Sequence, residues 1–234
     1  QASGGGNYSA VISDNGRYIT YQSSATNLVS GDTNSKSDVF LYDTQTATTT
    51  RVSVSSAGTQ GNGNSAGASS PSISSDGRYV IYQSDATNLV SGDTFGKPDV
   101  FLYDTQTATT TRVNLTENGT QTNGWTTHSQ GISADGKFVV YYSDSTNIVS
   151  NDTNATADVF LTSSDTTPPV FASATVNGAS LVLSYTEAGT LDAAHAPATS
   201  RFAVTAGGAA VTVSSVAVDA AARTVTLTLD SAVT

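Results

Sequence analysis

Two segments of the chain, residues 25–52 and 86–113, differ at only three of their twenty-eight positions. A third, more distant copy aligns with them, and the three units begin at Ile12, Ile73 and Ile132. The repeat period is therefore 73 − 12 = 61 residues and then 132 − 73 = 59 residues. A period of this size, in units made of short strands, is typical of a propeller or a solenoid and not of one irregular sandwich.

Each unit has the pattern of short strands joined by tight turns. In the second unit the predicted strands are "SPSIS", "YVIYQS", "DVFLYD" and "TTTRVNL", and the predicted turns are "SDGR" and "TQTA". Asp, Asn and Gly favour the turn conformations, while aromatic and β-branched residues fill the flanking strands. We therefore predict four strands in each complete unit.

The third unit departs from this pattern after "ADVFLTSSD", where "TTPPVF" stands in place of "TQTATTTRV". We expect this unit to lack its fourth strand. Because a propeller ring needs roughly four to eight blades, three units are too few to close one. Further blades are expected either upstream of Gln1 in a parent polypeptide or from neighbouring chains.

The repeated run S-x-D-G-[RK]-[YF]-[VI]-x-[YF]-x-S, followed by D-V-F-L-Y-D, carries a family resemblance. Over residues 8–162 the chain resembles the WD40-like blades of TolB-type β-propellers. The resemblance implies four-stranded blades and identifies no activity.

A second domain is predicted after a short linker. The two prolines of "TTPP", residues 166–169, cannot join a β-ladder and stiffen the chain. From residue 170 the chain becomes rich in Ala and Val, with alternating strands such as "ASLVLSY" and "RTVTLTL". The expected fold is therefore all-β, with propeller-type blades over 1–165 and an Ig-like β-sandwich over 170–234 that lacks its last strand.

The stretch "DTTPPVFASATVNGASLVLSY" carries the second resemblance. Residues 165–234 resemble the Ig-like repeat of SwmB-type swimming-motility surface proteins of cyanobacteria and of other large bacterial adhesins. This resemblance implies a spacer, an adhesive head or an assembly unit at a bacterial surface.

The composition limits the partners and the compartment. Nine Lys and Arg stand against nineteen Asp and Glu, so nucleic acid and anionic membranes would be repelled. No apolar run is long enough to cross a bilayer, and the absence of Cys fits an extracellular setting. The start at Gln1, without a signal peptide, is expected for a mature or trimmed fragment.

The Asp-rich loop of each unit is the candidate metal site. Hard cations such as Ca²⁺ bind carboxylate and amide oxygens spaced along a tight loop, so calcium is the candidate cofactor. The alternative, favoured because no bidentate Glu follows in any copy, is an Asx-turn in which Asp caps the loop backbone. The candidate ligands are Asp32, Asn34 and Asp38 in the first unit, Asp93 and Asp99 in the second, and Asp152, Asn154 and Asp158 in the third.

No catalytic constellation is predicted. The G-x-S-x-G match around Ser65 lies in a Gly-, Asn- and Ser-rich loop, without the strand and helix of a nucleophile elbow. His128 and His195 belong to different predicted domains, as do Glu117 and Glu187. The single Trp, Trp125, is expected either in the core or as a stacking surface for a sugar or a partner.

The sequence therefore favours a non-enzymatic structural or adhesive module of a secreted or cell-surface bacterial protein. Its expected partners are other copies of itself or adjacent domains of a longer chain, with a glycan or a protein surface as a further candidate. Missing strands in both domains would permit head-to-tail strand complementation into filaments. The alternative is an accessory or ligand-binding propeller domain of a larger secreted hydrolase.

Overall fold

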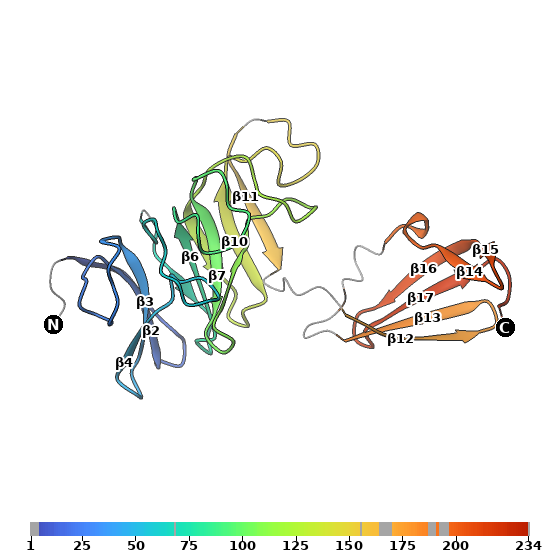
Figure 1. The fold of residues 1–234 in the computed structure, drawn as a ribbon, viewed down its shortest axis with the longest axis horizontal. Helices are drawn as coiled ribbons and strands as arrows, with labels where there is room; N and C mark the ends of the chain where they lie inside the picture. The colour runs from blue at the N-terminus through green and yellow to red at the C-terminus, as the bar shows by residue number, and fades with distance from the viewer. Residues whose placement is uncertain are drawn as a thin grey trace. The chain divides into compact units, whose positions relative to one another are not determined.

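The chain forms two compact units, Gln1–Thr166 and Thr167–Thr234 (Figure 1). The structure is a computed structural model that describes residues 5–67, 69–154, 156–163, 170–186, 191 and 197–233, with the side chains of 127–129 left out. Both units are built from β-sheets, and the one helical turn in the described part is a 3₁₀ turn at Thr199–Arg201. The predicted proline linker, 166–169, lies outside the described residues.

The first unit contains three antiparallel sheets that correspond to the three repeats. Blade 1 has the order β1-β2-β3-β4, with β1 at Asn7–Ile12, β2 at Tyr18–Ser23, β3 at Asp38–Asp43 and β4 at Thr48–Arg51. Blade 2 repeats this order with β5 at Ser72–Ile73, β6 at Tyr79–Ser84, β7 at Asp99–Asp104 and β8 at Thr109–Arg112. The prediction of four strands in each complete unit is confirmed.

Blade 3 is shorter by one strand in the described part of the chain. It contains β9 at Thr126–Ile132, β10 at Phe138–Ser143 and β11 at Asp158–Ser163, in the order β11-β10-β9. Strand β11 pairs with β10 and occupies the position that β3 and β7 hold in the other blades. Among the described residues, β11 is thus the sheet edge where a fourth strand would add.

The repeated turn before the second strand of each blade is fixed by its own side chains. The Oδ1 atom of Asn15 accepts hydrogen bonds from the Ser13 hydroxyl at 2.7 Å and from the Arg17 N–H at 2.9 Å. The same bonds recur in the segments 74–78 and 133–137. An Asx-type turn of this kind is a local property of the sequence, so it forms in all three blades.

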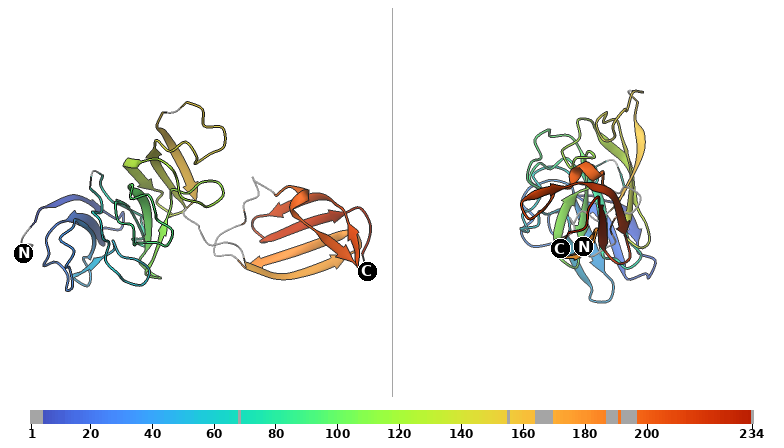
Figure 2. Two further views of the ribbon diagram at one scale, coloured as in Figure 1. Left: turned by 45° about the horizontal axis from the view of Figure 1, so that its top comes forward. Right: turned by 90° about the vertical axis from the view of Figure 1, so that its right-hand side faces the viewer.

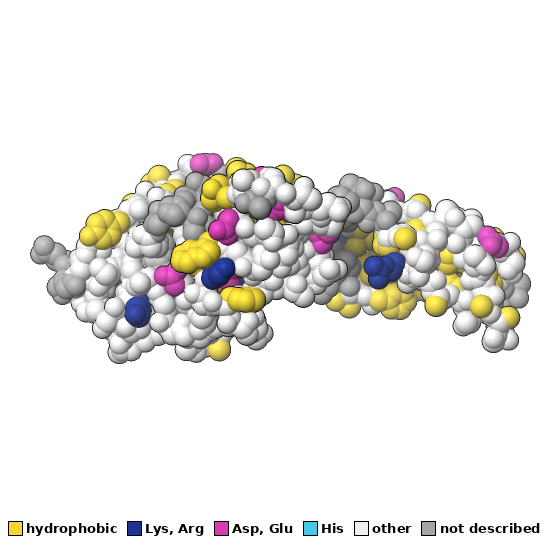
Figure 3. Space-filling model, turned by 90° about the horizontal axis from the view of Figure 1, so that it is seen from above, with side chains coloured by type: hydrophobic (Ala, Val, Ile, Leu, Met, Phe, Trp, Pro, Cys, Tyr) yellow, Lys and Arg dark blue, Asp and Glu magenta, His cyan; other side chains and the backbone are white. Residues whose placement is uncertain are grey.

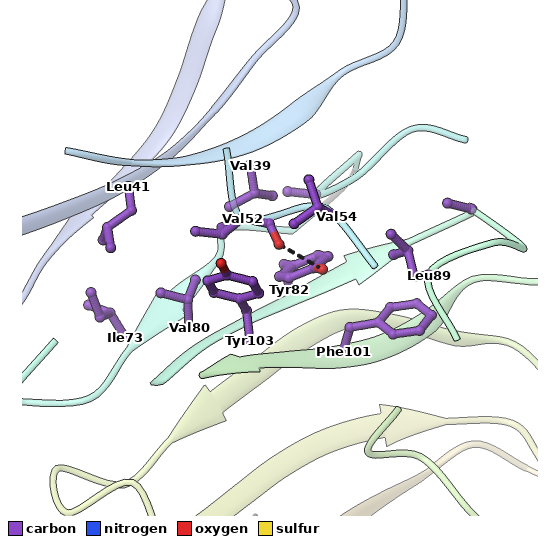
Figure 4. Close-up of a cluster of buried hydrophobic side chains, with 12 residues drawn as sticks. Val39, Leu41, Val52, Val54, Ile73, Val80, Tyr82, Leu89, Phe101 and Tyr103 are labelled. Carbon is purple, nitrogen blue, oxygen red and sulfur yellow. Dashed lines mark hydrogen bonds between the residues drawn. The ribbon is translucent and has the colours of Figure 1, made fainter. Parts of the chain in front are cut away.

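Adjacent blades pack through apolar faces. Val39 and Leu41 of blade 1 meet a cluster on one face of blade 2, which Figure 4 shows together with the hydrogen bond from the Tyr82 hydroxyl to the Val52 carbonyl, 3.1 Å long. The opposite face of blade 2 packs on blade 3. The blade 2 members of the first cluster include Val80, Tyr82, Phe101 and Tyr103; the second cluster joins Ile81, Val100 and Leu102 to Val139 and Tyr141.

The segments that follow β4 and β8 fasten one blade to the next. Asn62 exchanges hydrogen bonds with Thr87 and Asn88, and its N–H to Asn88 Oδ1 distance is 2.9 Å. Asn123 makes the same bonds to Thr146 and Asn147 one repeat later. The long loops therefore connect adjacent blades, because their asparagine side chains form hydrogen bonds with residues of the following blade.

The second unit is a small β-sandwich-type fold. One sheet has the order β12-β13-β17-β16, with β12 at Val170–Asn177, β13 at Ser180–Thr186, β16 at Val213–Asp219 and β17 at Thr224–Leu229 (Figure 2). A hairpin of β14 (Val204–Ala206) and β15 (Ala209–Val211) contributes Val204 and Val211 to the core of this sheet. Val225, Leu227 and Leu229 alternate along β17 and are buried in that core, as the strand pattern predicts.

The described part of the chain holds no helix with the length and apolar character needed to cross a membrane.

Candidate functional site

In blade 1 the Asp-rich loop and the end of β4 form a buried cluster of Asp32, Asp38 and Arg51. One nitrogen of Arg51, Nη1, lies 3.4 Å from Asp32 Oδ1 and 3.5 Å from Asp38 Oδ2. The Ser53 hydroxyl donates to Asp38 Oδ1 at 2.6 Å. The side chain of Asp38 is fully buried and that of Arg51 is 10% exposed, so the guanidinium compensates two carboxylates away from water.

Blade 2 repeats the cluster with Asp93, Asp99 and Arg112. Nη1 of Arg112 lies 3.3 Å from Asp99 Oδ2 and 3.9 Å from Asp93 Oδ1. Asn114 takes the place of the serine and donates to Asp99 Oδ1 at 2.5 Å, and Gln121 donates to Asp93 Oδ1 at 2.9 Å. The two loops that are nearly identical in sequence are therefore also alike in how their charge is compensated.

Burial dominates the electrostatics of both clusters. It raises the pKa of Asp38 above its ordinary value, although the Ser53 hydrogen bond and the Arg51 charge oppose the shift. Burial likewise raises the pKa of Asp99, against the Asn114 hydrogen bond and the Arg112 charge. Each carboxylate therefore depends on its neighbouring arginine and amide or hydroxyl donors to remain charged in the fold.

The asparagines of the candidate metal set form turns. Asn34 Oδ1 accepts the Lys36 N–H at 2.9 Å, and Asn154 Oδ1 accepts the Thr156 N–H at 3.0 Å. Their amide nitrogens face the carboxylates instead, with Asn154 Nδ2 at 3.1 Å from an oxygen of Asp158. The amide oxygens that the calcium hypothesis requires are thus engaged in turns made by Asn, whereas the Asx-turn alternative assigned that role to Asp. Calcium binding itself stays a prediction.

Blade 3 contains the acidic pair without its arginine. Asp152 and Asp158 are half-buried, and Asn154 donates to Asp158. The position equivalent to Arg112 is 112 + 59 = 171, where the sequence has Phe171 on β12 of the second unit. Among the described residues, the loop carboxylates of Asp152 and Asp158 therefore have no arginine at the position that compensates their counterparts.

Sequence reasoning missed the arginines Arg51 and Arg112. Both stand thirteen residues after the second Asp of their loop, since 51 − 38 and 112 − 99 are equal, and both lie within the repeated segment. A repeated basic residue on the strand beside a repeated acidic loop is the signal that could have identified them. The contacts are long-range, and only the pairing of Phe40 with Arg51 and of Phe101 with Arg112 aligns the arginines with the loops.

The residues considered for catalysis do not come together in the described part of the chain. Ser65 is fully buried, its hydroxyl lies 2.9 Å from that of Ser84, and its N–H donates to the Ser37 carbonyl. Glu117 accepts a weak hydrogen bond from the Ser150 N–H at 3.4 Å. His195, Glu187 and the side chain of His128 lie outside the described residues. Ser65 thus has a structural role, and the described side chains do not place a base beside it.

Exposed apolar side chains are a feature of the molecular surface (Figure 3). Trp125 and Phe95 lie on loops with 53% and 57% of their surface exposed. Larger exposed fractions occur on β11, where Val159 and Leu161 are each 71% exposed. Contiguous exposed apolar side chains mark contact surfaces more often than isolated ones do, so this face of blade 3 is a candidate contact surface.

A family model described as "Putative flagellar system-associated repeat" matches residues 164–234. This match supports the prediction of a repeat unit after the blades, while its Ig-like character and its resemblance to SwmB-type proteins stay predictions. The comparison with curated proteins returned no match.

The comparison with solved structures found partial similarity to proteins from three species. The "putative TolB" of Agrobacterium tumefaciens shows 16% identity and a TM-score of 0.39, with 68% of this chain and 46% of that chain covered. TolB of Acinetobacter baumannii shows 14% identity and a TM-score of 0.28, covering 98% and 56%. The β-propeller domain of the Trilobed protease of Pyrococcus furiosus shows 10% identity and a TM-score of 0.32, covering 78% and 66%.

The chain spans less than two thirds of either TolB protein. The fold class rests on the chain's own sheets: two complete four-stranded antiparallel blades, a three-stranded third blade and a sandwich-type unit. In the described residues the chain is thus all-β, with propeller-type blades followed by a segment, 164–234, that is similar to the flagellar system-associated repeat.

Proposed function

We propose that the chain is a non-enzymatic structural or adhesive module of a secreted or cell-surface bacterial protein, and that it assembles with copies of itself by completion of blade 3. The observation that carries this proposal is the edge of β11. In the described residues this edge has no fourth strand, and the adjacent Asp152 and Asp158 have no arginine.

The chemistry of the missing strand can be read from the complete blades. In both, the fourth strand is "TTTR", and its arginine bridges two loop carboxylates. A strand that added to β11 with the same register would bring an arginine to Asp152 and Asp158. Main-chain hydrogen bonds would supply affinity, and the charge contact would fix the register.

The proposal is tested with a labelled peptide of residues 105–115, "TQTATTTRVNL", added to the chain. Fluorescence anisotropy should show saturable binding, and a peptide with Met in place of its arginine should bind at least about tenfold more weakly. The Asp152→Asn, Asp158→Asn double variant of the chain should bind the unmodified peptide more weakly by the same factor. Absence of binding, or equal binding of both peptides, would contradict strand completion.

Of the three loops, the acidic pair of blade 3 is the better candidate for calcium binding, because Arg51 and Arg112 form ion pairs with the carboxylates of the other two loops. The alternative function, an accessory domain of a larger secreted hydrolase, predicts that the chain neither binds this peptide nor associates with itself. The two functions are therefore distinguished by the same experiment.

A further inference from the structure

The two faces of blade 2 show how one blade contacts the next. The face toward blade 3 carries Ile81, Val100 and Leu102, whose exposed fractions are 0%, 1% and 4%. The face toward blade 1 carries Ile73 and the buried aromatic residues of the first cluster. Each blade therefore has a forward face and a rear face, and an apolar core forms where a forward face meets the rear face of the following blade.

Blade 3 has the same forward face, but it is open. The residues 59 positions after Ile81, Val100 and Leu102 are Val140, Val159 and Leu161, and these are 39%, 71% and 71% exposed. Phe138, in the position of Tyr79, is 50% exposed. In the described part of the chain no blade covers this face, although its residue types are those that blade 2 buries.

The rear face of blade 1 is exposed in part, although Phe40, in the position of Phe101, is fully buried. Ile12, in the position of Ile73, is 56% exposed, whereas Ile73 is 8% exposed against blade 1. Tyr8, on the same strand as Ile12, is 61% exposed. In the described residues the first unit thus carries an exposed forward face on blade 3 and a partly exposed rear face on blade 1.

Within the first unit, each contact between a forward face and the following rear face includes an aromatic ring that packs on a glycine. The Tyr18 ring of blade 1 lies so close to Gly77 of blade 2 that a Cβ there would collide with it, and the Tyr79 ring lies in the same way on Gly136 of blade 3. Gly16 of blade 1 is the equivalent glycine, and a Cβ at this position would meet nothing within 4 Å. Within the described residues, the ring of Phe138 therefore has no equivalent glycine of a following blade, and Gly16 has no equivalent ring of a preceding blade.

We infer that two copies of the chain dock head to tail, with Phe138 of each copy over Gly16 of the other, and close one ring. The described residues contain three blades, so two copies of residues 1–234 contain six, within the roughly four to eight that close a propeller, whereas three copies would contain nine. A head-to-tail contact that closes gives a ring and not a filament. This inference goes beyond the proposed strand completion, because it uses the exposed faces of blades 3 and 1 and not the edge of β11, and it states the number of copies in the ring.

Sedimentation velocity and light scattering of the whole chain test the inference directly. The expected mass is twice 23.8 kDa at high protein concentration, with dissociation to 23.8 kDa on dilution. A monomer at every concentration would overturn the inference. Open-ended growth of the mass with concentration would overturn ring closure.

Two variants address the contact itself. Gly16→Asn adds a side chain in the docking position, and asparagine tolerates the φ of +70° found there. Phe138→Ser removes the aromatic ring. Each should raise the dimer dissociation constant by about thirtyfold or more, as expected for the loss of a buried anchor at two interfaces.

The chain offers matched controls. Gly31 has a φ of +78° and open space around it. The Gly31→Asn variant therefore makes the same substitution at a similar backbone conformation, but outside the two docking faces. Phe95 is 57% exposed on a loop, so Phe95→Ser repeats the loss of an exposed aromatic. Both controls should dimerise as the unmodified chain does, and an equal weakening by a control and its test variant would overturn the contact.

Mixing provides an independent measurement. The Gly16→Asn variant keeps its Phe138, and the Phe138→Ser variant keeps its Gly16, so a mixture can form one intact contact. The mixture should contain more dimer than either variant alone, and no gain on mixing would overturn the head-to-tail arrangement. Peptide binding at β11 does not involve Gly16, so it separates a failure of this interface from a failure of the proposed function.

Discussion

The ring of Tyr18 occupies the space that a side chain at Gly77 would need. Gly77 also has a φ of +79°, in the region that favours glycine. Two independent constraints therefore act on one turn residue, one from the backbone and one from the neighbouring blade.

Gly77→Ala should consequently destabilise the first unit more than Gly92→Ala does. Gly92 has a φ of +76° but no atom within 4 Å of an added Cβ, so it reports the backbone cost alone. The collision with Tyr18 should add about 1–3 kcal/mol to the loss of unfolding free energy. Urea denaturation of both variants measures the difference, and equal losses would show that the blade contact adjusts without cost.

Arg51→Met should destabilise blade 1 strongly, because it leaves Asp32 and Asp38 buried without a cation. The expected loss is about 3–5 kcal/mol, the usual effect of removing one partner of a buried ion pair. Replacing both aspartates by asparagine in the same chain should recover part of that loss. Arg17→Met, at an ion pair whose arginine side chain is 39% exposed, is the control and should cost clearly less.

The first unit should lose stability in acid partly through Asp43. The Arg17 hydrogen bonds, 2.7 and 3.0 Å long, hold the pKa of Asp43 well below its ordinary value in the folded chain. Its contribution is therefore present above the unfolded pKa of about 4 and is lost as the pH falls below that value.

An Asp43→Asn variant isolates this contribution. The difference in unfolding free energy between the unmodified chain and the variant should shrink as the pH is lowered below about 4. The raised pKa values of Asp38 and Asp99 act in the opposite direction, because the folded state takes up those protons first. A difference that stayed constant with pH would contradict the role of the Arg17–Asp43 pair.

Chelation should have little effect on the melting temperature of blades 1 and 2. Their loop carboxylates are already bridged by Arg51 and Arg112, which leaves few free oxygens for a divalent cation. Any calcium binding detected by calorimetry should be weak and should disappear in the Asp152→Asn, Asp158→Asn double variant. Tight calcium binding that survives this double variant would place metal in the first two loops instead.

Much of the fold could be predicted because its signals are local. The turn at Ser13–Arg17 is closed by hydrogen bonds between residues no more than five apart, and it recurs with the same residue types in each repeat. The described residues of blade 3 form three strands, and this difference could likewise be predicted, because "TTPPVF" lacks the "TTTR" segment.

The candidate site could be predicted only in part. The loops with Asp32, Asp93 and Asp152 were identified as the sites of interest, but the partners of their carboxylates were not. Arg51 lies thirteen residues after Asp38, and nothing in that spacing alone indicates an ion pair. Pairing of β4 beside β3 places the arginine there, and this is a consequence of sheet register.

The sequence by itself determined the repeat period, the strands and turns of each blade, and the change to a second kind of β-unit after residue 165. These properties follow from local backbone preferences and from the alternation of side chains along a strand. The tertiary structure alone decided which carboxylates share an arginine, and it decided that Leu102 is buried while Leu161 is exposed on an equivalent strand. The reason is physical: charge compensation and burial depend on which blade lies alongside, and no local sequence contains that neighbour.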